Sequence, residues 1–252
     1  MTDTILYQQS SHIGRLLLNI PERHNALGEE QLLAVRKLLA GFAAANAPRV
    51  LVISGAGNRT FCAGASLKEL NSGKISGELF QQTTDMMAAL PMPTVAAING
   101  SVFGGGVELA LSCDFRVGVA GGRLRVPAAA IGLCYPLGGI ERFVQRLGVA
   151  ATKRLLLAAE ELDSAAMLDI GFLDYLVTVE QFQATVDSLA GNLAGLAPLA
   201  VRAMKQTIAE CAAGVLDLAT AQARVRLCSE SEDLAEGFMA QRQKRSPEFR
   251  GC

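Results

Sequence analysis

The sequence predicts an α/β fold that ends in a helical C-terminal region. Short β-like runs alternate with helical patterns up to about residue 180, and beyond that point the patterns are helical alone. Alternation of this kind is typical of a sheet covered by helices. Half of the 252 residues are hydrophobic, which is enough to bury a sizeable core.

The alternating part contains five β-like runs and four helical patterns. The β-like runs lie at residues 5–8, 15–20, 50–54, 94–98 and 115–119. The helical patterns lie at residues 29–45, 79–90, 105–113 and 140–147. No internal sequence repeat or low-complexity tract is evident, so nothing in the sequence itself reveals a repeated unit.

Four further helical patterns follow beyond about residue 180, at residues 182–196, 198–211, 216–228 and 231–245. Pro198 fits an early helical position, and Gly214 fits a break between two helices. We expect a division near Leu196, into a core of residues 1–196 and a helical region of residues 197–252. Apolar stripes on these helices fit either an internal core or an interface between subunits.

Composition excludes several classes of function. The formal net charge of −1 argues against a strongly electrostatic nucleic-acid or membrane partner, and no uninterrupted apolar run is long enough to span a bilayer. Only two histidines, His12 and His24, are present, so neither a histidine-built metal site nor a Ser-His triad is expected. The six cysteines form no C-x-x-C pair, and residues 1–15 are too polar for a signal peptide, so we expect reduced thiols and a cytoplasmic location.

The first candidate site lies in residues 95–114, VAAINGSVFGGGVELALSCD. A β-like run enters a turn, three glycines at 104–106 follow, and Glu108 stands at the start of an apolar helical run. Glycines at a helix start expose N–H groups that have no internal partner, and these favour negative charge. The stretch therefore offers an oxyanion donor beside a general acid or base. It also fits a glycine-rich turn packed against a strand, with Glu108 as a partner of the helix dipole.

A second turn of small residues lies in residues 59–70, RTFCAGASLKEL. Ala63, Gly64 and Ala65 again expose backbone N–H groups after a strand, and Lys68, one helical turn beyond Gly64, fits either a phosphate contact or a solvated surface lysine. Two such turns suggest paired N–H donors around one carbonyl. The Gly55–Gly57 pattern is not a dinucleotide fingerprint, because its sixth position is Thr60 and no helix opens there.

Five motifs in a fixed order resemble the crotonase family, the enoyl-CoA hydratases and isomerases. They are PERHNAL at 21–27, FCAGASLKEL at 61–70, AAINGSVFGGGVELALSCD at 96–114, the GG-x-x-R run at 138–142 and DLAEGFMAQRQKRSPEF at 233–249. The resemblance covers nearly the whole chain. It implies a spiral of repeated ββα units, closed by a C-terminal helical region that assembles a homotrimer or a dimer of trimers. It also implies an acyl-CoA substrate, with coenzyme A entering as part of the thioester and no permanently bound cofactor.

The resemblance also implies roles for particular residues. The backbone N–H groups of Ala65 and Gly105 take the places of the oxyanion hole, and Glu108 takes that of the first of two hydratase glutamates. The positions that receive the CoA adenine and phosphates are Arg23, Ala26, Ala63, Leu67 and Lys68. Lys244 and Phe249 match positions that contact the CoA of a neighbouring subunit.

The sequence departs from the hydratase pattern in three places. The second glutamate is replaced by Ala128, the aspartate usual after A-G-A is Ser66, and the usual P-G-x-G-G reads YPLGG at 135–139. Hydration needs a base on water and an acid for the α-carbon. Cys134, Tyr135 and Glu141 lie near the emptied position in sequence, and each fits either an auxiliary role or simple packing and surface exposure. Isomerisation, decarboxylation or thioester hydrolysis through Glu108 stays open beside hydration, as does CoA binding with little catalysis.

Overall fold

Six strands of the main sheet lie in the order β1-β2-β3-β5-β7-β10 in the computed structural model, which describes residues 3–42 and 47–252. The strands are β1 (Ile5–Ser10), β2 (Ile13–Leu18), β3 (Val50–Gly55), β5 (Thr94–Ile98), β7 (Phe115–Val119) and β10 (Tyr175–Val177). β1 pairs with β2 antiparallel, and every other pair is parallel. All five predicted β-like runs fall within two residues of one of these strands.

A second sheet of very short strands has the order β4-β6-β8-β9. The strands are β4 (Thr60–Cys62), β6 (Ser101–Phe103), β8 (Arg123–Arg125) and β9 (Leu162–Asp163). Along the chain, β3 in the first sheet leads to β4 in the second, β5 leads to β6, and β7 leads to β8. Each turn of the spiral therefore adds one strand to each sheet before a helix closes it. The predicted α/β class and the spiral of ββα units are confirmed.

Helices close the turns of the spiral and cover both faces of the main sheet. They are α1 (Glu29–Gly41), α2 (Leu67–Asn71), α3 (Gly77–Ala88), α4 (Gly105–Leu111), α5 (Leu137–Leu156), α6 (Ser164–Asp169) and α7 (Val179–Ala194), with 3₁₀ turns at Pro21–Arg23 and Ala129–Ile131. Residues 43–45 of the helix expected at 29–45 lie outside the described residues. The helix expected at 140–147 is longer than predicted. It continues past Gly148, whose φ of 75° interrupts it.

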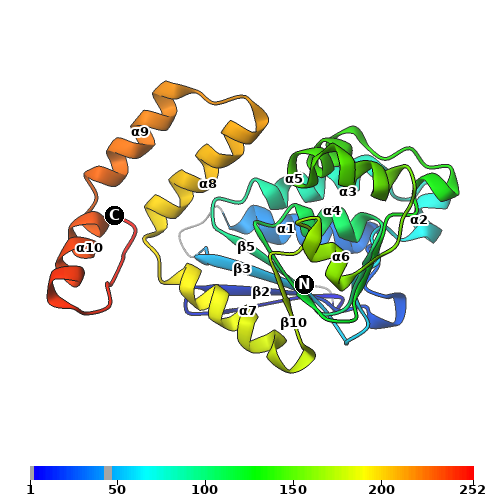
Figure 1. Cartoon of the computed structure of the whole chain (residues 1–252), viewed down its shortest axis with the longest axis horizontal. Helices are drawn as coiled ribbons and strands as arrows, with labels where there is room; N and C mark the ends of the chain where they lie inside the picture. Colours follow the sequence, from blue (N-terminus) through cyan, green and yellow to red (C-terminus); the bar gives the residue numbers. More distant parts are fainter. Residues whose placement is uncertain (1–2, 43–46) are drawn as a thin grey trace.

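Two layers of apolar side chains hold the main sheet. Figure 1 shows α7 on one face of the sheet and α1, α3, α4 and α5 on the other. On the α7 side, Val50, Val52 and Val95 pack with Val186 and Ala190 of the helix. The opposite face carries the larger cluster. Burial on both faces explains why β3 and β5 are nearly continuous apolar runs.

The last three helices, α8 (Pro198–Ala213), α9 (Leu218–Ser229) and α10 (Glu232–Gln243), extend to one side of the core (Figure 1). The chain bends by 103° between α7 and α8. Lys205 on α8 reaches back to the core, where its Nζ lies 2.6 Å from Asp114 Oδ2 and donates to the carbonyl of Met92 at 2.8 Å. Among the described helices, no single one has the length and apolar character needed to cross a membrane, although the bent pair α7 and α8 passes the same test jointly.

Candidate active site

Three turns meet along one edge of the second sheet. β4, β6 and β8 are parallel neighbours, so the residues that follow their carboxyl ends lie side by side. These residues are 63–66, 104–106 and 126–128. A hydrogen bond from Gly104 N–H to the carbonyl of Arg125, 2.9 Å long, joins the second turn to the third. The topology therefore collects at one place the two suggested oxyanion donors and the position of the absent second glutamate.

Close backbone packing explains the glycines of the first two turns. Gly64 has a φ of +85°, and a Cβ added to it would lie 2.9 Å from Gly105 Cα. A Cβ added to Gly105 would lie 2.6 Å from the ring of Phe80. Larger residues would push the turns apart, so glycine keeps the two backbones in contact.

The N–H groups of Ala65 and Gly105 are free to bind a ligand. Neither has a hydrogen-bond partner among the described residues. Backbone groups beside Ala65 are paired, since Leu27 N–H donates to Gly64 O and Ser66 N–H to Leu27 O, each at 2.8 Å. Gly105 is also the first residue of α4, where the helix dipole favours negative charge. This arrangement is suited to an oxyanion.

Glu108, one turn into α4, is almost fully buried and is held through a single oxygen. Thr84 Oγ1 donates to Oε1 at 2.7 Å, and Arg142 Nη1 donates to the same oxygen at 3.2 Å. Arg142 Nη2 pairs in turn with Asp85 at 2.6 Å. Burial raises the pKa of the Glu108 carboxyl above its ordinary value. The hydrogen bond from Thr84, the positive charge of Arg142 and hydrogen bonding from Tyr135 oppose that rise.

The other oxygen of Glu108 faces the turn before α5. A Cβ added to Gly139 would lie 3.1 Å from Glu108 Oε2 and 2.5 Å from the ring of Tyr135, so both side chains pack closely against this glycine. The Tyr135 ring packs edge-on against Phe143, with centroids 5.6 Å apart. Its hydroxyl is buried and makes no hydrogen bond of ordinary geometry among the described residues. Burial, followed by the negative charge of Glu108 and hydrogen bonding to its carboxylate, raises the pKa of Tyr135 well above 10.

The other auxiliary candidates are not brought to Glu108. Cys134 and Glu141 are exposed to solvent. Ala128 is buried at the start of the 3₁₀ turn that follows β8, and it packs in the main apolar cluster. Of the three auxiliary candidates, the structure places Tyr135 alone beside Glu108.

The two segments suggested to receive CoA lie side by side. Besides the Leu27 contacts above, Ala63 N–H donates to the carbonyl of His24 at 3.0 Å. Segment 23–27 therefore runs along segment 63–68. Three of the five candidate side chains are exposed, Arg23, Leu67 and Lys68, and Ala26 and Ala63 are half-buried. The serine that replaces the usual aspartate, Ser66, caps α2 by accepting a 3.5 Å bond from Glu69 N–H, a role that either residue type fills.

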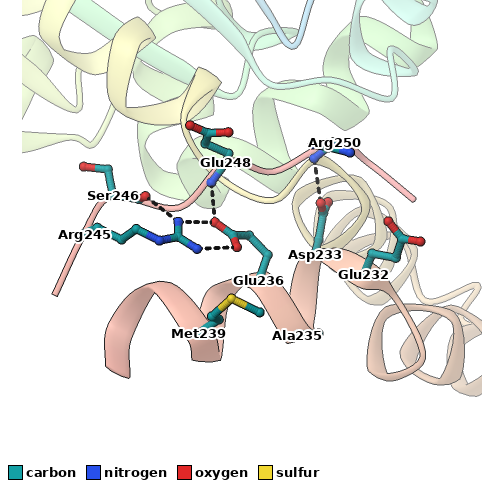
Figure 2. A pocket seen from close by; sticks show the side chains of 9 residues that line it. All are labelled: Glu232, Asp233, Ala235, Glu236, Met239, Arg245, Ser246, Glu248 and Arg250. Atoms are coloured by element: carbon teal, nitrogen blue, oxygen red, sulfur yellow. Dashed lines mark hydrogen bonds and ion pairs between the residues drawn. The ribbon is translucent and has the colours of Figure 1, made fainter. Parts of the chain in front are cut away.

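Lys244 and Phe249 lie at the opposite end of the molecule, where the C-terminal tail folds back on α10. Figure 1 places α2 and α10 at opposite ends. Figure 2 shows the tail, where Glu236 accepts from Glu248 N–H at 2.8 Å and Asp233 accepts from Arg250 N–H at 2.7 Å, beside a pocket of about 410 Å³. Within one chain, these two residues do not meet the CoA segments.

Sequence reasoning missed two members of the Glu108 cluster. Arg142 is the last residue of the GG-x-x-R run, so the motif was seen but its role was not. Thr84 lies inside α3, and no sequence signal sets it apart from the neighbouring Thr83. Both roles depend on how α3 and α5 pack on α4.

Comparison with known proteins places this architecture in one family. The profile of the family described as enoyl-CoA hydratase/isomerase matches residues 8–251. The chain belongs to the enoyl-CoA hydratase/isomerase family.

Individual members of the family are similar over almost their full length. The 2,3-dehydroadipyl-CoA hydratase of Escherichia coli is 30% identical, with all of both chains covered. The mitochondrial enoyl-CoA hydratase domain-containing protein 2 of Mus musculus is 34% identical, covering 95% of this chain and 84% of its own. The solved structure of an enoyl-CoA hydratase from Bacillus anthracis superposes with a TM-score of 0.90 at 28% identity, covering 99% of this chain and all of its own.

Proposed function

We propose that this family member acts on acyl-CoA thioesters by stabilising a thioester enolate, with Glu108 as the group that moves the proton. The observation that carries the proposal is a pair of N–H groups, on Ala65 and Gly105, that have no partner in the described part of the chain and lie beside a buried carboxylate bonded through Oε1. The names of relatives, such as 2,3-dehydroadipyl-CoA hydratase, support this substrate class.

Each part of the site has a task in such a reaction. The thioester oxygen accepts from both N–H groups, and negative charge developing on it is stabilised by these donors and by the α4 dipole. Removing one such donor costs roughly 10²–10³-fold in rate. Glu108 Oε1 is fixed by Thr84 and Arg142, which leaves Oε2 to take or give a proton.

The proposal extends to CoA binding and assembly. The Arg23–Lys68 surface would receive the CoA adenine and phosphates. Lys244 and Phe249 would contribute to the CoA of a neighbouring subunit, in a homotrimer or a dimer of trimers. Exposed apolar side chains on the C-terminal helices support such an assembly, among them Met204, Ile208, Val225 and Phe238. We place the division between core and assembly region near Leu196 and the protein in the cytoplasm.

A second reaction type has a specific observation in its favour. The position of the second hydratase glutamate is filled by the buried methyl group of Ala128, so no second carboxylate stands there. Decarboxylation leaves an enolate that needs a single proton, whereas hydration needs two proton transfers. Thioester hydrolysis would use the same N–H pair for a tetrahedral oxyanion, and CoA binding with little turnover needs no proton transfer.

One assay separates these functions. The purified protein is incubated with crotonyl-CoA and with malonyl-type CoA esters, beside Glu108→Gln. We expect turnover of an acyl-CoA that depends on Glu108, and slow hydration of crotonyl-CoA. Tight CoA binding without turnover of either class would contradict the enzymatic proposal and favour the binding protein.

A further inference from the structure

The segment that carries Gly105 and Glu108 begins and ends at one place. It comprises residues 94–114, from the first residue of β5 to the residue before β7, and we call it the site segment. The N–H and Oγ1 of Thr94 donate to Asp114 Oδ2 at 2.7 and 2.9 Å. Asp114 N–H donates back to Thr94 Oγ1 at 2.9 Å and to the Thr94 carbonyl at 3.1 Å. These reciprocal bonds close the site segment on itself.

Lys205 reaches this closure from the helical arm, which consists of α8, α9 and α10. Its Nζ donates to Asp114 Oδ2 at 2.6 Å and to the carbonyl of Met92 at 2.8 Å. The side chains of the ion pair are 13% and 20% exposed, so water screens their attraction only in part. Among the described residues, Lys205 is the one α8 side chain that hydrogen-bonds to the core, and it is the one ion-pair partner of Asp114.

The other cation at this turn has different partners. Arg116, on β7, donates to the carbonyls of Cys113 and Asp114 at 3.0 and 3.4 Å. Its guanidinium also pairs with the carboxylate of Asp174 at 2.9 Å. Arg116 therefore holds the backbone of the turn, and the Asp114 carboxylate is left to Lys205. Without the ammonium group, a largely buried carboxylate would lack a counter-ion, which costs more than one lost hydrogen bond.

A shift at Asp114 would reach the candidate catalytic groups through α4. Asp114 follows closely on Leu111, the last residue of this helix, and six of the seven helix residues are buried. Close-packed interiors transmit strain, so a short buried helix moves as a unit. Gly105 and Glu108 both lie in its first turn. A misplacement of about 1 Å at such groups costs on the order of 10²-fold in rate.

We propose that Lys205 is a positioning residue, whose bond to Asp114 keeps the site segment closed and so couples the placement of the helical arm to the geometry of Gly105 and Glu108. The inference rests on the proposed acyl-CoA chemistry at those two residues. In this role Lys205 contacts no substrate and moves no proton. It acts through its charge, which a neutral side chain of similar length does not replace.

The test is a double-mutant cycle on the full-length protein, made of Lys205→Met, Asp114→Asn and the two combined. Activity is the exchange of the α-protons of butyryl-CoA in D₂O, measured by NMR as kcat and KM, with Glu108→Gln as the inactive reference. Amide hydrogen exchange, read by mass spectrometry, reports the closure of the site segment directly. Lys205→Arg keeps the charge. Lys37→Met, in an exposed lysine on α1, is the matched control.

We expect Lys205→Met to lower kcat roughly 3- to 30-fold with KM little changed, and to speed amide exchange in residues 104–112. Lys205→Arg should lose less, because its charge still pairs with Asp114. The combined variant should be no slower than Lys205→Met, since no unpaired carboxylate is left and the asparagine oxygen still accepts from Thr94. Lys37→Met should match wild type in both measurements. If Lys205→Met does not fold, Lys205→Gln takes its place, with the same expected direction.

The two measurements separate this inference from the proposed function. Wild-type kcat and amide exchange in folded Lys205→Met would overturn the role of Lys205, as would losses from the two single substitutions that multiply in the combined variant. Faster amide exchange throughout the core, α1 included, would show a general loss of stability and would overturn it as well. Absence of Glu108-dependent exchange of butyryl-CoA in the wild-type protein would instead overturn the proposed function, and the amide exchange of residues 104–112 would still decide whether Lys205 closes the site segment.

Discussion

Helices α4 and α8 show two ways of using apolar side chains in one chain. α4 has seven residues and buries six of them inside the spiral core. α8 has sixteen residues, and none of them is buried. α9 likewise has no buried residue, and Met204 and Ile208 of α8 are more than half exposed. The apolar side chains of α4 are buried within one chain, whereas those of the C-terminal helices remain largely exposed. Chemistry and assembly should therefore respond to different substitutions.

The largest effect is expected from Glu108→Gln, which breaks the chemistry and leaves assembly intact. We expect a fall in turnover of roughly 10²–10⁴-fold, because the group that moves the proton is lost while its volume and its bond from Thr84 are kept. Light scattering should show the wild-type oligomer. Glu230→Gln, on the exposed end of α9, is the matched control. Near wild-type turnover in Glu108→Gln would move the chemistry to another residue.

The same variant has a signature in the pH dependence of stability. A carboxyl whose pKa is raised in the folded state binds its proton more tightly there than in the unfolded chain, so the ionised form opposes folding. Protonated Glu108 therefore contributes to stability at pH values below its pKa in the unfolded chain. This contribution is lost as the pH rises through its pKa in the folded protein. The Tm of Glu108→Gln should therefore equal or exceed that of wild type at pH 7. The difference should shrink on acidification, as thermal melts can show.

Gly105→Pro should have the second largest effect, a fall in turnover of roughly 10²–10³-fold. Proline removes the N–H group outright, and the first position of a helix tolerates proline. Added atoms would also meet the ring of Phe80, 2.6 Å from the added Cβ. The comparison is therefore made in a Phe80→Leu background. Gly105→Ala in that background adds a Cβ and keeps the N–H. Equal turnover by the proline and alanine variants would rule out this oxyanion donor.

Ala128→Glu restores a carboxylate at the position of the second hydratase glutamate, and it should raise activity where the variants above lower it. We expect crotonyl-CoA hydration to rise at least tenfold, since a missing acid or base typically costs 10²–10⁴-fold. Burying a carboxyl at this position lowers stability, so folding is followed by circular dichroism. Ala128→Gln has nearly the same shape without the charge. If the wild-type protein hydrates crotonyl-CoA at a rate typical of dedicated hydratases, the absence of a carboxylate at position 128 does not limit the reaction.

The smallest effect on turnover is expected from Ile208→Asp, which breaks assembly alone. A charge on the exposed apolar stripe of α8 should lower the molar mass measured by light scattering at micromolar concentration. The far-ultraviolet circular dichroism of the core should persist. KM for the CoA ester should rise more than kcat falls, because Lys244 and Phe249 would no longer reach a neighbour. Ile208→Met should behave as wild type, and a monomeric wild-type protein would refute the prediction.

Much of the first sheet was predictable from the sequence, and little of the second. Five of the six main-sheet strands contain five or six residues, most of them apolar, which is enough to show a pattern. The strands of the second sheet have two or three residues, and β8 reads Arg-Leu-Arg with both arginines exposed. Such short strands form because successive turns of the spiral stack on one another. They are too short to show a periodic pattern in the sequence.

The site likewise contains residues that sequence motifs predict and residues that only the packing of helices reveals. Ala65 lies in a turn with a sequence signature, and Gly105 and Glu108 begin the helix after another. The topology brings these segments together as the motif order implies. Thr84 and Arg142 gain their roles only when α3 and α5 pack on α4. Whether Cys134, Tyr135 or Glu141 faces Glu108 depended on the direction in which the turn before α5 presents each side chain, which sequence spacing does not give.

The hold on one oxygen of Glu108 has a stereochemical consequence. In the proposed reaction, with Oε1 fixed by Thr84 and Arg142, the proton would leave and return through Oε2, on one side of the flat enoyl group. Hydroxyl and hydrogen would then join the double bond from the same face, by syn addition. Hydration in D₂O would give a single diastereomer of the labelled 3-hydroxyacyl product, so the bonds to one carboxylate oxygen would set the relative configuration of the two new centres.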